Sequence, residues 1–169
     1  MASAAVRITV DEFLALPEIE NPHRELVHGE IWEEPAENRG ETHEIVKSNL
    51  AFALSLFAGR PRLLIGSSFW FGDAMLVPDL SLLINSCEVD RTSIPDIAIE
   101  IVSADSATRL MEKIALYRES AVSEIWVLYP RRGTIAIYTK NAVREVRETG
   151  SLTSPLLPGF ALPLAELFS

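Results

Sequence analysis

Hydrophobic and polar residues follow two different spacings along this chain, which predicts a structure that mixes helices with strands. Apolar residues recur every three to four positions over residues 42–58 and 107–119, the spacing of amphipathic helices. Short apolar runs elsewhere predict buried strands. The predicted strands cover residues 25–32 as a hairpin, 63–71, 75–84, 97–102, 124–129, 134–139 and 143–147. The order strand, helix, strand over residues 97–129 predicts a βαβ unit with two parallel neighbouring strands and a right-handed crossover.

Turn and capping residues divide these elements. Residues 9–12 have the spacing of a capping box, a threonine hydroxyl followed three residues later by a glutamate, and predict a short helix. His28-Gly29 is the expected turn of the hairpin, and Gly59 is placed to end the helix that starts at residue 42. The proline-rich apolar tail at 154–168 is expected to pack over one end of the fold. We expect residues 1–169 to form a single domain, since no linker or repeat interrupts them.

Composition limits the classes of function. No run approaches the roughly 18 apolar residues that span a bilayer, and the first residues lack the pattern of a signal peptide. The single cysteine, Cys87, excludes an internal disulfide and is typical of a reducing compartment, so a cytoplasmic protein without membrane contact is expected. The net charge of −9 argues against a broad basic face for nucleic acid.

Glu100 stands out in the apolar strand over residues 97–102. Because side chains alternate across a strand, the three isoleucines of this segment share one face, and Glu100 projects from the other face beside Ala98. A carboxylate in such a place is costly unless it is paired, hydrogen-bonded, protonated or bound to a cation. An exposed strand face or a salt bridge to a buried arginine would also explain it.

Asp79 is the candidate partner of Glu100. It begins the apolar run Leu80 to Ile84, and about ten residues connect this run to the next strand, enough for the two to run antiparallel. That arrangement brings Asp79 towards Glu100. Two carboxylates from adjacent strands suit Mg²⁺ or Mn²⁺, which prefer oxygen ligands. Asp96 lies four residues before Glu100, roughly 13 Å along a strand, so it cannot reach the same ion.

The helix at 107–119 carries Lys113 on the same side as its buried stripe of Leu110, Ile114 and Tyr117. Such a lysine either extends outward along its aliphatic stem or points over the strand edge towards Glu100. The three histidines lack the spacing of a zinc site, and His43, at a polar helix start, is expected at the surface, with a position that reaches the cleft as the alternative.

Six segments together resemble the Uma2 family of restriction-endonuclease-like proteins, which belong to the PD-(D/E)xK nuclease superfamily. They cover almost the whole chain: VDEFLALPE, RELVHGEIWEEP, VPDLSLLI, PDIAIEIVSADS, EKIALYRESAVSEIWVLYP and LLPGFALPL. The resemblance implies an α/β fold with a mixed central sheet flanked by helices. It also implies a metal-dependent DNA endonuclease with catalytic residues Glu25, Asp79, Glu100 and Lys113. Asp79 and Glu100 would then hold Mg²⁺ or Mn²⁺, and Glu25 would bind a second ion or orient water.

The chain departs from the family pattern at several positions. The superfamily's usual strand lysine is replaced by Val102, and Arg109 stands where an acidic residue is common. These departures, with the negative charge, leave two alternatives open: a catalytically inactive binding or assembly module, and a hydrolase of a small phosphorylated substrate. The apolar tail and uncovered strand edges also make a homodimer an expectation.

Overall fold

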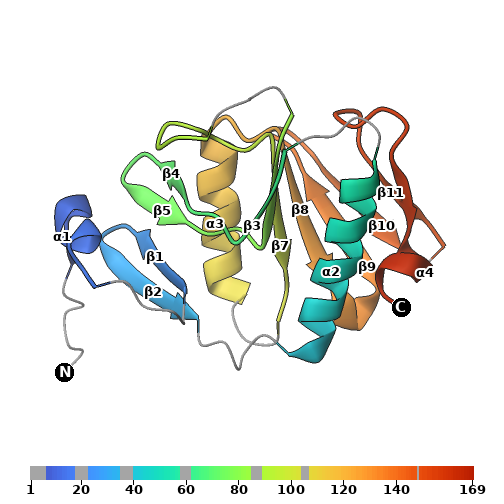
Figure 1. Cartoon of the computed structure of the whole chain (residues 1–169), viewed down its shortest axis with the longest axis horizontal. Helices are drawn as coiled ribbons and strands as arrows, with labels where there is room; N and C mark the ends of the chain where they lie inside the picture. Colours follow the sequence, from blue (N-terminus) through green and yellow to red (C-terminus); the bar gives the residue numbers. More distant parts are fainter. Residues whose placement is uncertain are drawn as a thin grey trace.

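The computed structural model describes residues 7–17, 23–34, 40–57, 62–84, 89–103, 107–147 and 149–169. A six-stranded sheet stands between two helices, α2 (Glu41–Leu56) and α3 (Ala107–Glu119) (Figure 1). Its strands, in spatial order, are β10 (Val143–Arg147), β9 (Thr134–Tyr138), β8 (Glu124–Tyr129), β7 (Ile97–Ile101), β6 (Leu80–Leu83) and β3 (Arg62–Ile65). The predicted mixed sheet flanked by helices is confirmed.

The centre of this sheet is the predicted βαβ unit. β7 and β8 are parallel neighbours, with Ile97 opposite Glu124 and Ile101 opposite Leu128, and α3 connects them. β6 runs antiparallel on the other side of β7, with Leu80 opposite Ile99. The residue before Leu80 therefore lies beside the residue after Ile99, which sets the position of the polar site described below.

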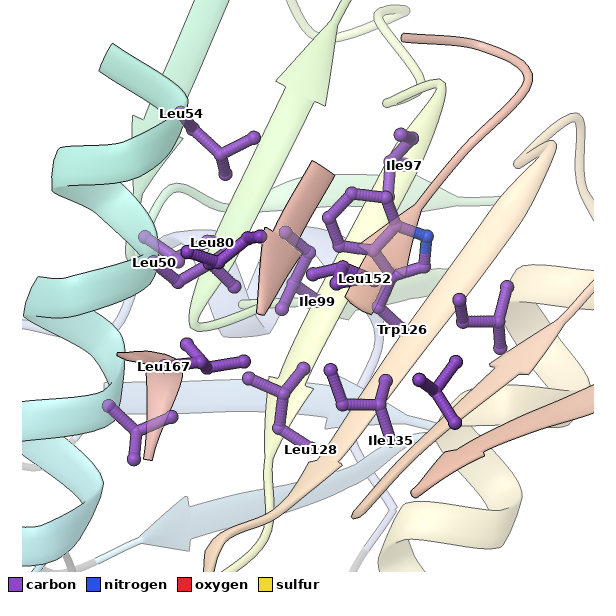
Figure 2. Close-up of a cluster of buried hydrophobic side chains, with 14 of the residues drawn as sticks. Leu50, Leu54, Leu80, Ile97, Ile99, Trp126, Leu128, Ile135, Leu152 and Leu167 are labelled. Carbon is purple, nitrogen blue, oxygen red and sulfur yellow. The ribbon is translucent and has the colours of Figure 1, made fainter. Parts of the chain in front are cut away.

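The α2 face of the sheet carries the larger hydrophobic core (Figure 2). Ile97, Ile99 and Trp126 point from the sheet towards Leu50 of α2, and all four side chains are buried. The C-terminal segment closes this face with β11 (Ser151–Thr153), β12 (Ala161–Pro163) and α4 (Leu164–Leu167), which packs on α2. Its apolar residues join the same core, so the expected packing of the tail is confirmed.

The α3 face is covered by α3 and by a second sheet. This sheet has the order β2 (Glu30–Glu34), β1 (His23–Val27), β5 (Ala74–Leu76) and β4 (Phe69–Phe71). Phe71 and Val27 from the second sheet pack in one cluster with Ile114 and Tyr117 of α3. The second sheet is therefore held against the helix that follows Glu100.

Two predicted strands are each divided between the two sheets. Residues 63–71 form β3 and β4, and residues 75–84 form β5 and β6, so the expectation of two continuous strands is wrong. Gly66 turns the chain with a φ of +58°, a conformation that suits glycine. Pro78 has no N–H group to donate to a strand ladder, and the second break falls there.

Most local predictions agree with the structure. The capping box is formed by Thr9 and Glu12 at the start of α1 (Val10–Leu14). The first hairpin turns at His28-Gly29, both with positive φ. α2 ends at Leu56, whereas Gly59 lies outside the described residues. Within the described ranges, no helix is long and apolar enough to cross a membrane.

Candidate functional site

Asp79 and Glu100 lie side by side on neighbouring antiparallel strands. Asp79 precedes β6, Glu100 belongs to β7, and the register that pairs Leu80 with Ile99 places the two acidic residues opposite each other. The Asp79 Oδ2 atom accepts a hydrogen bond of 2.8 Å from the backbone N–H of Ile101. Glu100 is 8% exposed. The backbone thus holds both carboxylates at the same end of the sheet.

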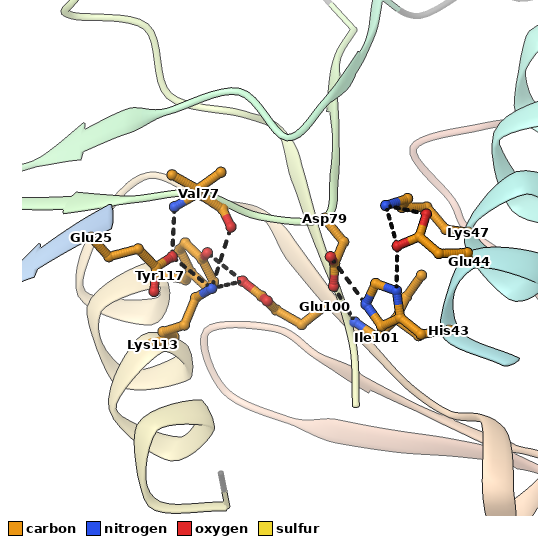
Figure 3. A network of polar contacts seen from close by, with 10 residues as sticks. All are labelled: Glu25, His43, Glu44, Lys47, Val77, Asp79, Glu100, Ile101, Lys113 and Tyr117. Carbon is orange, nitrogen blue, oxygen red and sulfur yellow. Dashed lines mark hydrogen bonds and ion pairs between the residues drawn. The ribbon is translucent and has the colours of Figure 1, made fainter. Parts of the chain in front are cut away.

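Lys113 of α3 lies between two of the acidic residues (Figure 3). Its Nζ atom is 2.8 Å from Glu25 Oε1 and 2.8 Å from Glu100 Oε1. The carbonyl of Val77 accepts a further hydrogen bond from Nζ at 3.4 Å. Of the two orientations expected for this lysine, outward or towards Glu100, the structure has the second. Glu100 therefore pairs with a lysine and not with the buried arginine that was considered.

Glu25 reaches this cluster from β1 of the second sheet. Its Oε1 atom also accepts a hydrogen bond of 2.7 Å from the backbone N–H of Val77, in the segment between β5 and β6. Glu25 therefore contacts Glu100 through the Lys113 ammonium group. The structure brings Glu25, Asp79, Glu100 and Lys113 together at one place.

Tyr117 is a member of the cluster that the sequence reasoning treated only as core. It follows Lys113 by one helical turn, is fully buried, and donates a hydrogen bond of 2.6 Å to Glu100 Oε1. Its ring packs edge-on against Phe71, with 5.1 Å between centroids. The sequence spacing could have identified Tyr117 as a member of the cluster, because it lies four residues after Lys113 on the same helix face.

His43 is buried, so the expectation that it lies at the surface is wrong. Its Nε2 atom is 3.2 Å from Asp79 Oδ1, and its Nδ1 atom is 3.1 Å from Glu44 Oε1. Lys47 in turn pairs with Glu44 at 2.7 Å. His43 lies three residues before Val46 and shares the buried stripe of α2, a spacing that could have identified it.

Burial and neighbouring charges shift the pKa of Glu100 and that of Asp79 in opposite directions. Burial, with smaller contributions from nearby Asp79 and Glu25, raises the pKa of Glu100 to about 7, although the Lys113 charge acts to lower it. For Asp79, burial also acts to raise the pKa, but the hydrogen bond and charge of His43 and the Ile101 N–H outweigh it and leave the pKa lowered. Asp79 is therefore the more readily ionised of the two.

The pKa values of Lys113 and His43 are both raised above their ordinary values. Burial acts to lower the pKa of Lys113, but the carboxylates of Glu100 and Glu25 raise it. Burial likewise acts to lower the pKa of His43, and the Asp79 hydrogen bond and charge raise it above 6.5. Both residues supply positive charge to a cluster of carboxylates.

Two other residues singled out in the sequence have structural contacts. Asp96 Oδ2 accepts a hydrogen bond of 2.6 Å from the Ile84 N–H, which ties the residue before β7 to the residue after β6. Arg109 donates to the Glu33 carbonyl at 3.2 Å, and its guanidinium lies 5.3 Å from the centre of the Trp32 ring. Arg109 is therefore anchored on β2.

The donor set suits a hard divalent cation that keeps part of its water shell. Within the described ranges, no three histidine, cysteine, aspartate or glutamate side chains are arranged to hold a metal ion between them. Mg²⁺ is commonly bound by one or two carboxylates, with water and substrate phosphate as its other ligands. The adjacent carboxylates of Asp79 and Glu100 fit that pattern, and burial, with smaller contributions from Asp79 and Glu25, raises the pKa of Glu100 in the absence of a cation.

Comparisons with known proteins agree with this fold. The chain is similar to a crystal structure from Anabaena variabilis described as "a putative nuclease belonging to DUF820", with 24% identity, a TM-score of 0.83, and coverage of 95% of this chain and 97% of that one. None of the curated proteins matches the chain. The model of the Uma2 family, described as "Putative restriction endonuclease", matches residues 10–165. Since this match spans most of the sequence, the chain belongs to the Uma2 family.

Proposed function

We propose that this protein is a metal-dependent endonuclease that hydrolyses phosphodiester bonds of DNA. The observation that supports it most is the pairing of Asp79 and Glu100 on adjacent strands, with Lys113 Nζ 2.8 Å from Glu100. One Mg²⁺ or Mn²⁺ bound by the two carboxylates would polarise the phosphate and lower the pKa of a water molecule for in-line attack.

Each residue of the cluster has a separate part in this proposal. Asp79 and Glu100 hold the ion, and their positions are fixed by the strand register and by the Ile101 N–H. Lys113 stabilises negative charge that develops on the phosphate, and takes the part of the strand lysine that Val102 replaces. For Glu25, the family resemblance implies a second ion or an oriented water; we instead propose that it holds Lys113 in place through Oε1, which also accepts from the Val77 N–H.

The charges of the cluster support one divalent ion. Glu25, Asp79 and Glu100 are three acidic groups; Lys113 contacts Glu25 and Glu100, and His43 contacts Asp79. Burial is the main cause of the raised pKa of Glu100, and the charges of Asp79 and Glu25 add to it; a divalent cation between Asp79 and Glu100 would offset both effects. The ion would also reduce the repulsion between DNA and a chain whose net charge is −9.

The first test is Mn²⁺ binding by calorimetry, followed by cleavage of supercoiled plasmid with Mg²⁺. We expect wild-type protein to bind Mn²⁺ and nick plasmid, and Asp79→Asn and Glu100→Gln to lose both properties. Glu124→Gln is the matched control, since Glu124 is also buried but bonds to the indole N–H of Trp126 at 2.7 Å, at the opposite end of the paired strands.

The outcomes separate the possible functions. Cleavage that survives in Asp79→Asn and Glu100→Gln would refute the assignment. Mn²⁺ binding without plasmid cleavage, combined with hydrolysis of bis(p-nitrophenyl) phosphate, would favour a small phosphorylated substrate. Absence of Mn²⁺ binding, also with a short DNA duplex present, would favour the inactive binding or assembly module.

A homodimer is also part of this proposal, because two paired sites could act on the two strands of a duplex. Light scattering at high protein concentration tests it. We expect the mass of two chains, and a monomer mass would contradict this part of the proposal.

A further inference from the structure

Two side chains of α3 donate to the same oxygen of Glu100. Lys113 Nζ lies 2.8 Å from Oε1, and the Tyr117 hydroxyl donates to Oε1 at 2.6 Å. A carboxylate oxygen has two lone pairs in its plane, so these two donors fill the acceptor capacity of Oε1. All the contacts of Glu100 found within the described residues involve Oε1, which leaves Oε2 as the oxygen available to a cation.

Tyr117 is itself held firmly. Its ring packs edge-on against Phe71 of β4, at 5.1 Å and 75°, and the side chain is fully buried. Lys113 and Tyr117 lie one helical turn apart, so the position of α3 fixes both donors together. Figure 3 shows the lysine and the tyrosine on the same side of Glu100, opposite Asp79 and His43.

We propose that Tyr117 is a positioning residue that sets the orientation of the Glu100 carboxylate, so that Oε2 is directed to the metal ion. The inference rests on the proposed metal site at Asp79 and Glu100. Lys113 alone is a flexible donor that also contacts Glu25 and Val77, and it does not define the plane of the carboxylate. The second donor, on a rigid aromatic ring, fixes that plane.

The test compares Tyr117→Phe with Tyr138→Phe. The first variant keeps the ring against Phe71 and removes only the hydroxyl, and the second removes a tyrosine hydroxyl from β9, away from the site. Partners that orient metal ligands typically change metal affinity 10–100-fold, so we expect Tyr117→Phe to weaken Mn²⁺ binding about tenfold. Tyr138→Phe should leave the Mn²⁺ dissociation constant unchanged.

A second measurement needs no metal. In protein labelled with ¹³C at the glutamate side-chain carboxyl, the Glu100 signal is assigned by its absence in Glu100→Gln. We expect this signal to shift in Tyr117→Phe, because one of its two donors is lost, and to keep its position in Tyr138→Phe. Circular dichroism and urea unfolding establish that each variant is folded.

The results separate this inference from the proposed function. Wild-type Mn²⁺ binding that Tyr117→Phe leaves unchanged or makes tighter overturns the role of Tyr117 and leaves the nuclease proposal standing. A wild-type chain that binds no Mn²⁺, with or without DNA, overturns both. If Tyr117→Phe does not fold, an unshifted Glu100 signal in Phe71→Leu, which loosens the Tyr117 ring, overturns the inference.

Discussion

Asp79 Oδ2 lies 2.8 Å from the backbone nitrogen of Ile101, the residue that directly follows Glu100. This hydrogen bond joins the Asp79 carboxylate, next to β6, to the backbone of β7. It does so directly beside Glu100, the acidic residue of β7. The backbone therefore fixes the Asp79 carboxylate beside the strand that carries Glu100, and Lys113 and Tyr117 hold the Glu100 carboxylate.

Asp79→Ala should destabilise the protein more than Asp79→Asn. Alanine leaves the Ile101 N–H and the His43 ring without their acceptor, a loss of about 1–3 kcal/mol in the free energy of unfolding. Asparagine keeps a carbonyl oxygen for the Ile101 N–H. Urea unfolding measures the difference, and calorimetry should show that both variants lose Mn²⁺ binding. Equal stability of the two variants would contradict the structural role of this hydrogen bond.

Glu100→Gln should become more stable than the wild type as the pH rises. The pKa of Glu100 is raised from 4.5 to about 7 in the folded state, so its contribution to stability is fully present below pH 4.5 and is lost as the pH rises through 7. The full loss is of the order of 3 kcal/mol. Glutamine does not titrate and avoids this loss.

Urea unfolding of both proteins from pH 5 to pH 8 measures this effect. Saturating Mn²⁺ at pH 8 should reverse the order, because the ion stabilises only the chain that binds it. A constant difference between wild type and Glu100→Gln across this range would refute the raised pKa.

Local sequence patterns predicted those elements whose hydrophobic spacing lies within the element itself. Residues 107–119 were predicted as a helix from apolar spacing and form α3 over the same residues. The Asp79–Glu100 pair could also be predicted from the sequence, because strand alternation and a short connection between the strands define which side chains meet. These predictions needed only nearest-neighbour geometry.

Features that depend on distant packing were missed. The division of residues 63–71 between two sheets depends on partners in β5 and β6, which a single apolar run does not reveal. His43 was expected at the surface because it begins a polar helix turn, yet its burial depends on the contact between α2 and Asp79. Tyr117 fitted a core stripe, and only the folded structure places its hydroxyl on Glu100.

His43 should titrate above its ordinary pKa of 6.5 and respond to Asp79. Burial acts to lower the pKa of His43, but the Asp79 hydrogen bond and charge raise it. The stabilising contribution of this pair is therefore present below pH 6.5 and lost as the pH rises through the folded-state pKa. Proton NMR of the imidazole signals should show a lower pKa in Asp79→Asn. An unchanged His43 titration in that variant would show that Asp79 is not its main partner.

Lys113→Met should uncover a second cation site. In the wild type the Lys113 ammonium already pairs with Glu25 and Glu100, so we expect one Mn²⁺ per chain by calorimetry. Methionine has a similar length and no charge. Removing one partner of a buried ion pair costs about 3–5 kcal/mol of unfolding free energy, and excess Mn²⁺ should restore most of it.

The matched control for Lys113→Met is Lys47→Met, which removes a lysine paired with the exposed Glu44 and should cost less than about 1 kcal/mol. The decisive quantity is the stoichiometry. Two Mn²⁺ per chain in Lys113→Met and one in the wild type would establish that the lysine occupies the place of a second ion. Two ions in the wild type would contradict it, because Lys113 would then not exclude the second ion.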